Sequence, residues 1–349
     1  MDRAVTRKDA AGAGVKQISL ALQGGGAHGA FTWGVIDALL DDERIEIEAI
    51  SGTSAGAMNA VVLAEGLLEG GRAAAKAQLE RFWRNASIDA RLPAPQRAAL
   101  QMLFNPQLQS MFPGAALMAG WVQSASPYAF NPLGLNPLRD FLVKEIDFAK
   151  VRRSQGLKLH IAATNVESGK IRIFEGRELT VDHILASACL PHLFQAVIID
   201  GAPYWDGGYM GNPAIYPLIY NSQSPDILLV QINPIERKGV PKTAHDIQNR
   251  VNEINFNSSL LREMRAIDFV ARLIDDGKLS PKEYKRVLMH RLAALEALPG
   301  LTPDSKLDAR WDFLVQLRDA GRGAAKAWLA KHYNDIGKRA TVDLKQEYM

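Results

Sequence analysis

A serine between two glycines is the first feature of this chain whose residue types and spacing could do chemistry. Gly52-Thr53-Ser54-Ala55-Gly56 has the form G-x-S-x-G and lies between a segment with a strand pattern and one with a helix pattern. In that context the glycines relieve crowding in a sharp turn, so the serine hydroxyl is exposed as a nucleophile. Ser54 would also lie at a helix N-terminus, where developing negative charge is favoured. The motif recurs by chance, so its position directly after a strand is what supports this interpretation.

A glycine-rich loop precedes this serine. Gly24-Gly25-Gly26-Ala27-His28-Gly29 fits G-x-G-x-x-G, a pattern of dinucleotide-binding loops. That function also needs an acidic residue at the end of the next strand, which here ends in Ile50-Ser51-Gly52. A P-loop would need Lys and Ser or Thr after Gly29, where Ala30-Phe31 stand instead. The loop is therefore either an anion-binding turn, whose free N–H groups could form an oxyanion hole, or a plain tight turn.

A carboxylate followed by two glycines is the third motif. Asp206-Gly207-Gly208 follows a short run with a strand pattern, Ala202 to Trp205. A carboxylate within hydrogen-bond reach of a serine can act as its base, although Asp-Gly-Gly by itself is most often a turn. In α/β-hydrolases a histidine follows the acid along the chain. Those that follow Asp206 lie in charged helical stretches: His245, His290 and His332. Others precede Asp206 and would break that order: His28, His183 and His192.

In this order, the three motifs resemble the patatin-like phospholipases. The segment from Ala186 to Phe194 and the pair Asn212-Pro213 also resemble blocks of that family, and the resemblance covers about residues 17–232. The chain departs from the family at His28, where Arg or Lys is more common. Five glycines support the motifs: Gly29, Gly52, Gly56, Gly207 and Gly208.

The resemblance implies a chemistry for these motifs. Ser54 would attack an ester carbonyl, Asp206 would accept its proton without a histidine, and backbone N–H groups of Gly24, Gly25 and Gly26 would form the oxyanion hole. Water would then release the acyl-enzyme. The implied substrates are lipid acyl esters, cleaved in a phospholipase A or lysophospholipase reaction, and no metal or other cofactor is implied. Alternatives are a lipid acyltransferase, a non-catalytic lipid-binding scaffold and, with less support, a nucleotide-binding α/β protein.

Strand and helix patterns alternate around the motifs. The clearest strand patterns are Gln17–Leu22, Ile45–Ala49, Leu157–Ala163, Ile171–Phe174, Val197–Ile199 and Ile227–Ile232. Helix patterns include Ala30–Leu40, residues 55–68 and Pro137–Glu145. Such alternation predicts an α/β protein with a parallel sheet. The resemblance makes this a three-layer α/β/α patatin-like fold with a central, mostly parallel sheet.

The chain divides into three parts by pattern. We expect residues 1–14 to be a flexible tail, residues 15–232 to be the acyl hydrolase domain, and residues 233–349 to be a helical C-terminal extension. The extension has an apolar stripe at helical spacing: Leu261, Met264, Ile267, Val270 and Ile274.

Within the second part, residues 88–135 form an apolar insert. No charged side chain occurs from Gln101 to Leu135, and helical patterns are interrupted at Pro93, Pro95, Pro106 and Pro113. We expect a lid over the acyl site that could also contact a lipid surface; an extra layer of core is the alternative. Three aromatic residues are candidates for the acyl pocket or lid: Phe112, Trp121 and Trp205.

Composition limits the remaining classes. The 349 residues are 47% hydrophobic and 23% charged, as in soluble globular proteins. The net charge of +3 is too weak to imply a nucleic-acid partner. The single cysteine, Cys189, excludes an internal disulfide framework and suits a reducing compartment. No stretch of 18 apolar residues occurs, so we expect a cytoplasmic protein with at most peripheral lipid contact. Its oligomeric state is not indicated.

Overall fold

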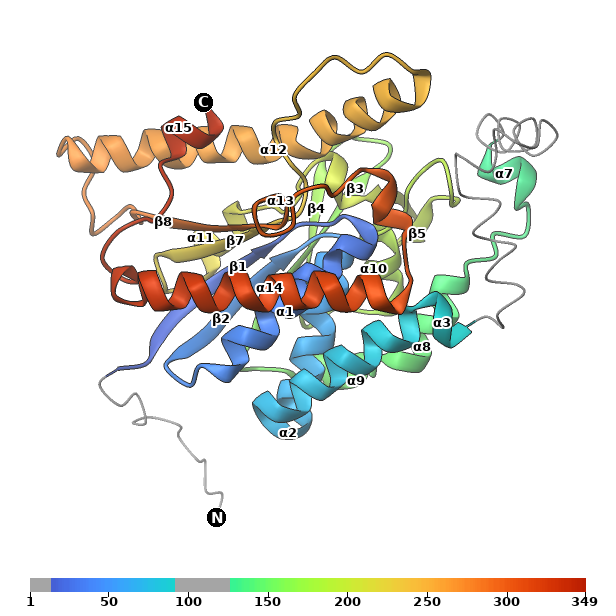
Figure 1. Ribbon diagram of the computed structural model, residues 1–349, viewed down its shortest axis with the longest axis horizontal. Coiled ribbons are helices and arrows are strands. Elements are labelled where there is room, and N and C mark those ends of the chain that lie inside the picture. Colours follow the sequence, from blue (N-terminus) through green and yellow to red (C-terminus); the bar gives the residue numbers. More distant parts are fainter. Residues whose placement is uncertain (1–13, 92–125) are drawn as a thin grey trace.

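A single mixed sheet lies at the centre of the computed structural model, which describes residues 14–91 and 126–349 (Figure 1). Within these ranges the sheet has eight strands in the order β5-β6-β3-β2-β1-β7-β8, and β4 also pairs with β3. The strands are β1 (Lys16–Leu22), β2 (Ile45–Gly52), β3 (Lys158–Asn165), β4 (Ile171–Glu175), β5 (Val197–Ile199), β6 (Ala202–Asp206), β7 (Asp226–Gln231) and β8 (Leu288–Ala293).

Five neighbouring strands, from β3 across to β8, run parallel to one another. Strands β4 and β6 run antiparallel to β3, and β5 runs antiparallel to β6. All six residues of β7 and the last five of β1 are buried. Near-continuous apolar runs of this kind suit parallel strands that are covered on both faces. The predicted central, mostly parallel sheet is confirmed.

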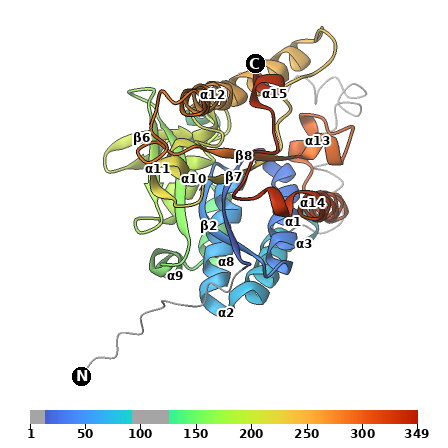
Figure 2. The same cartoon turned by 90° about the vertical axis from the view of Figure 1, so that its left-hand side faces the viewer.

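Helices cover both faces of the sheet (Figure 2). Because side chains alternate along a strand, Leu20 and Leu22 pack on one face while Ala21 packs on the other. The first face is covered by α1 (Gly29–Asp41), α2 (Ala55–Ala86), α8 (Pro137–Glu145), α9 (Phe148–Arg153), α10 (Val181–Ser187) and α14 (Trp311–His332). The second is covered by α11 (Tyr216–Asn221), α12 (Ala244–Asp275) and α15 (Leu344–Tyr348). These are the expected three layers.

The remaining elements are short. The other α-helices are α3 (Ile88–Arg91), α7 (Pro127–Phe130) and α13 (Ala294–Ala297). The 3-10 turns are η1 (Gly26–His28), η2 (Gly207–Tyr209), η3 (Asp304–Leu307) and η4 (Tyr333–Asp335). The backbone of α2 is non-helical at Gly70 and Gly71, which divides it just after the predicted end at residue 68. No described helix combines the length and apolar character that a membrane span needs.

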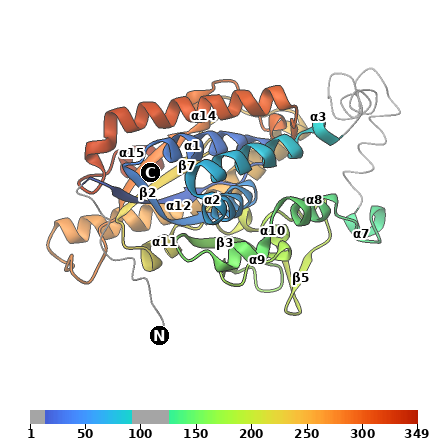
Figure 3. The same ribbon diagram turned by 90° about the horizontal axis from the view of Figure 1, so that it is seen from below.

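The C-terminal region packs against the rest of the fold at close range. Helices α1 and α14 lie side by side (Figures 1 and 3). A Cβ added at Gly34 of α1 would overlap the Arg318 carbonyl, and one added at Gly321 of α14 would overlap the Phe31 carbonyl. The region is largely helical, as expected, but it also contributes β8, which the helical pattern after Thr243 did not predict.

Candidate active site

Ser54 lies in the turn between β2 and α2. Its backbone has φ 53° and ψ −118°, which is uncommon for a residue with a side chain and marks a strained turn. A Cβ added at Gly52 would lie 2.8 Å from the backbone of Gly56, and one added at Gly56 would overlap the carbonyl of Leu22. Only glycine fits at these two positions. The strained turn that the motif predicts is present, with Ser54 at the start of α2, and the nucleophile role of Ser54 stays a prediction.

The backbone of Ser54 has a partner from another element. Its amide donates a hydrogen bond of 2.9 Å to Oγ of Ser187, the last residue of α10. Ser187 is completely buried. An acceptor held in the core therefore stabilises the strained turn that presents Ser54.

The register of the sheet places Asp206 beside Ser54. Strands β2 and β3 pair Gly52 with Ile161, and strands β3 and β6 pair Ala163 with Asp206. Ser54 follows Gly52 by two residues, as Ala163 follows Ile161. The serine and the carboxylate thus lie at the same level on either side of β3, although 152 positions of sequence separate them.

Asp206 is buried, and the pKa of its carboxyl group is raised. Only 2% of the residue is exposed, and its Oδ1 accepts a hydrogen bond of 2.7 Å from the amide of Gly208. Burial raises the pKa of Asp206 from 3.8 to about 7, and hydrogen bonds from the Gly208 amide and the Ser54 hydroxyl oppose that rise. A carboxyl group with this pKa can take up and release a proton near neutral pH.

The glycine-rich loop lies directly against Ser54. A Cβ added at Gly24 would lie 2.7 Å from Cβ of Ser54. The Gly24 amide donates a hydrogen bond of 2.7 Å to Oδ1 of Asn212, so it is already engaged. In the described part of the chain, the amides of Gly25 and Gly26 have no such acceptor. This narrows the candidate oxyanion donors from the three expected glycines to these two.

The other expected glycines allow close packing around the site. A Cβ added at Gly29 would lie 2.6 Å from Cβ of Ala55. Added Cβ atoms at Gly207 and Gly208 would overlap the Ala162 carbonyl and the Phe256 ring. The turn after Asp206 therefore lies directly against β3 and α12.

Of the three aromatic candidates for the acyl pocket or lid, the structure describes Trp205. Alternation along β6 places the Trp205 side chain on the sheet face opposite to the Asp206 carboxylate, which does not favour an acyl-pocket role. Phe112 and Trp121 lie outside the described residues, as does the insert from residue 92 to residue 125.

The histidines near the motifs have other partners. Nε2 of His28 lies 2.7 Å from Oγ of Ser305, and burial lowers the pKa of His28 to about 3. Nδ1 of His183 accepts a hydrogen bond of 2.9 Å from the Thr180 amide, and His192 is exposed. The histidines after Asp206 each pair with an aspartate elsewhere: His245 with Asp304, His290 with Asp226 and His332 with Asp335.

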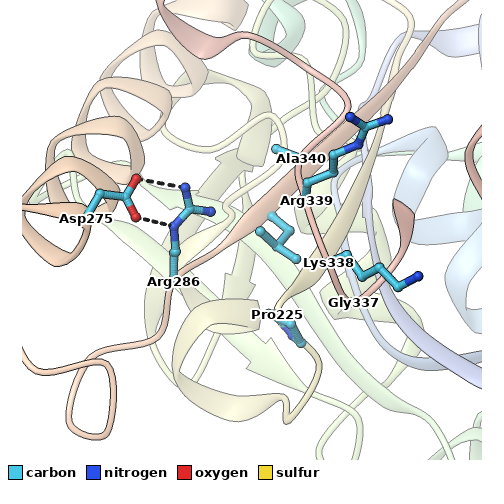
Figure 4. A pocket seen from close by; sticks show the side chains of 8 residues that line it. Pro225, Asp275, Arg286, Gly337, Lys338, Arg339 and Ala340 are labelled. Atoms are coloured by element: carbon cyan, nitrogen blue, oxygen red, sulfur yellow. Dashed lines mark hydrogen bonds and ion pairs between the residues drawn. The ribbon is translucent and has the colours of Figure 1, made fainter. Parts of the chain in front are cut away.

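A hollow of about 580 Å³ lies at the opposite edge of the sheet (Figure 4). It is lined by Pro225 and Leu288 at the amino ends of β7 and β8, and Asp275 and Arg286 form an ion pair on its wall. Ser54 follows the carboxyl end of β2. The hollow is therefore not part of the serine site.

The structure brings to the site three residues that the sequence motifs did not indicate. Ser187 and Asn212 lie within segments that carry the family resemblance, but their partners could not be read from the pattern. Asn233 follows β7, and its Nδ2 donates a hydrogen bond of 2.7 Å to the Gly24 carbonyl. Its position beyond the carboxyl end of a parallel strand is the only signal in the sequence that could have indicated it.

The chain belongs to the patatin-like phospholipase family, whose sequence model matches residues 20–219. The fold and the ordered motifs agree with this membership, and the family is one of lipid hydrolases. No curated protein sequence matches the chain at a significant level.

Solved structures similar to the chain include VipD from Legionella pneumophila, at 16% identity and a TM-score of 0.38 over 88% of this chain and 67% of VipD. ExoU in its complex with SpcU, from the type III secretion system of Pseudomonas aeruginosa, gives 16% identity and a TM-score of 0.38. That match covers 92% of this chain, which spans about half of ExoU, 52% of its length.

Proposed function

We propose that this protein is a lipid acyl hydrolase that cleaves carboxylic ester bonds with Ser54 as nucleophile and Asp206 as base. The observation that carries the proposal is the pairing of the two residues across the end of β3. A strained serine lies level with a buried carboxyl group whose pKa burial raises to about 7, a rise that the neighbouring Ser54 side chain opposes.

The reaction would proceed in two steps. In the first, Asp206 takes the proton from Oγ of Ser54 as Oγ bonds to the ester carbonyl carbon. The amides of Gly25 and Gly26 donate hydrogen bonds to the resulting oxyanion. When the carbonyl re-forms, the bond to the alcohol breaks, and Asp206 returns the proton to the leaving oxygen. In the second step, Asp206 takes a proton from water as the water oxygen bonds to the acyl carbon. The bond from that carbon to Oγ of Ser54 then breaks, Asp206 returns the proton to Oγ, and the fatty acid is released.

The substrates that suit this site are lipid acyl esters, in a phospholipase A or lysophospholipase type of reaction. The family supports lipid as the substrate class. We further propose a cytoplasmic protein that acts at a lipid surface. The mildly basic C-terminal part supports this, with 21 basic and 16 acidic residues over positions 231–349, because it favours contact with anionic headgroups.

The proposal is tested by incubating the purified protein with phosphatidylcholine, lysophosphatidylcholine and triacylglycerol, and measuring released fatty acid by mass spectrometry. We expect Ser54-dependent release from at least one of them. Ser54→Ala and Asp206→Asn should each lose nearly all turnover, because removing one member of a catalytic unit lowers turnover almost as much as removing both. Circular dichroism checks that both variants fold. Asp206→Asn activity within a few-fold of wild type would contradict the dyad, and a new ester formed with added alcohol would indicate acyl transfer instead.

A further inference from the structure

A side chain beyond the family-matched residues contacts the peptide that presents one oxyanion donor. Asn233, 2% exposed, donates from Nδ2 to the carbonyl oxygen of Gly24 at 2.7 Å. The Gly24 carbonyl and the Gly25 N–H belong to the same planar peptide unit and point in opposite directions across it. A hydrogen bond that fixes the carbonyl therefore also fixes the direction of the Gly25 N–H.

The amide of Asn233 is itself oriented by a lysine from the C-terminal region. Nζ of Lys306 donates a hydrogen bond of 2.7 Å to Oδ1 of Asn233. An ammonium group can only donate, so it defines which atom of the amide is oxygen and which is nitrogen. The positive charge also polarises the amide and strengthens its Nδ2–H as a donor.

Lys306 lies in η3, and two neighbouring residues of η3 pack against the glycine-rich loop. A Cβ added at Gly26 would overlap the Lys306 carbonyl, and Oγ of Ser305 hydrogen-bonds with His28. Burial is the main cause that lowers the pKa of Lys306; nearby Arg237 lowers it further and Glu253 raises it. Burial and the charges of Lys306 and Arg237 lower the pKa of His28 to about 3, so His28 is neutral at pH 7 and these two side chains supply the cationic charge next to this loop.

We infer that Lys306 and Asn233 are positioning residues for the oxyanion hole. The relay Lys306–Asn233–Gly24 holds the Gly25 N–H in the direction that the developing oxyanion needs. The C-terminal region thus completes a catalytic loop that lies at the other end of the sequence. This inference rests on the proposed esterase function, since it assigns a role within the same site.

The test uses the full-length protein and a soluble p-nitrophenyl ester. Asn233→Asp is nearly isosteric and keeps an acceptor for Lys306, but it cannot donate to Gly24. We expect its kcat to fall about 10²-fold, the order found when an oxyanion donor is lost, with KM changed less than threefold. Lys306→Met should lower kcat about tenfold or more, and Lys306→Arg should recover most of that loss.

Affinity for a trifluoromethyl ketone provides a second readout, because its adduct with Ser54 places an oxyanion in the hole. This affinity should fall in parallel with kcat, which a purely structural role would not produce. Lys285→Met is the matched control: Lys285 is also a lysine whose pKa burial lowers, and it donates to the Ser222 carbonyl at the opposite sheet edge. It should leave kcat unchanged.

The outcomes separate this inference from the function on which it rests. If the wild type shows no Ser54-dependent turnover, both are wrong. If turnover depends on Ser54 but folded Asn233→Asp and Lys306→Met keep kcat within twofold of wild type, the relay alone is wrong. Thermal unfolding shows which of the two variants is folded. If only one of them folds, its kcat alone decides whether the relay is wrong.

Discussion

The amide of Ser54 donates a hydrogen bond of 2.9 Å to Oγ of Ser187, across 133 positions of sequence. This contact joins the start of α2 to the end of α10 where the Ser54 backbone has a positive φ. It also links the nucleophile turn to the segment that leads into β5, β6 and Asp206. The Ser187 contact therefore connects the turn at Ser54 to the segment of chain that leads to Asp206, the other member of the proposed dyad.

Ser187→Ala should weaken catalysis by removing this acceptor. Leaving a buried donor without a partner costs about 1–3 kcal/mol, and here the cost falls on the turn that positions Oγ. We expect kcat on a soluble ester to fall about tenfold or more with little change in KM. Ser224→Ala is the control, since it also removes a buried hydroxyl, one bonded to the Gln17 carbonyl at the other edge of the sheet. Equal kcat in both variants would show that the Ser187 contact is not needed.

The rate should depend on the ionisation of Asp206. Because the folded-state pKa is about 7 and the base is the ionised form, kcat/KM should rise with pH through a single step near 7 and then level off. Burial also raises the pKa of Glu263 to about 7, but this residue bonds to the amides of Ile215 and Tyr216 away from the site. Glu263→Gln should therefore keep the step. Loss of the step in that variant would assign it to the wrong carboxyl group.

The same pKa has a consequence for stability. In the unfolded chain Asp206 loses its proton above pH 3.8, whereas in the folded protein it keeps the proton until about pH 7. The folded state therefore loses stability as pH rises through that interval. Asp206→Asn removes this penalty. Its melting temperature relative to wild type should be higher at pH 8 than at pH 4. A difference that is the same at both pH values would contradict the raised pKa.

Close approach of the loop to the nucleophile predicts a sharp effect at Gly24. The Cβ of Gly24→Ala would lie 2.7 Å from Cβ of Ser54 and 2.9 Å from the Thr53 carbonyl oxygen, so backbone must shift. Esterase activity should fall to background. Gly323→Ala in α14 meets no atom within 4 Å and should stabilise the helix by about 0.5–1 kcal/mol without changing activity. Activity in Gly24→Ala near that of wild type would contradict the described geometry.

No histidine should be essential. Substituting His28, His183 or His192 should leave turnover of a soluble ester within about tenfold, a small part of the roughly 10⁶ that a lost nucleophile costs. His28→Gln is preferred at the first position because Gln can still reach Ser305. A thousandfold loss of turnover at any of the three positions would instead indicate a catalytic triad.

Much of the fold could be predicted because its signals are local. The strand β5 and the helix α8 begin and end where the pattern placed them, β1 and β4 differ by one residue at one end, and β7 is shifted by one residue. The ordered glycine motifs indicated Ser54 and Asp206. Each of these depends on residues within a few positions of one another.

The parts that could not be predicted depend on contacts between distant residues. β8 was missed because Leu288–Ala293 adjoins further alanines and leucines in a helix-like composition, and pairing with β7 overrides that preference. Nothing local marks Asn233 or Lys306 as neighbours of Gly24, since their contact exists only once β7 and η3 are in place. The engagement of the Gly24 amide by Asn212 is likewise visible only in three dimensions.

In the proposed mechanism Ser54 is a nucleophile activated by Asp206, and the rate of covalent labelling by a fluorophosphonate tests this most directly. Peptide mapping by mass spectrometry locates the adduct, and the rate is measured against pH for wild type and Asp206→Asn. We expect a single adduct on Ser54, formed at a rate that rises through about pH 7, and at least a hundredfold slower labelling without that rise in the variant. An adduct elsewhere, or equal rates in the two proteins, would contradict the account.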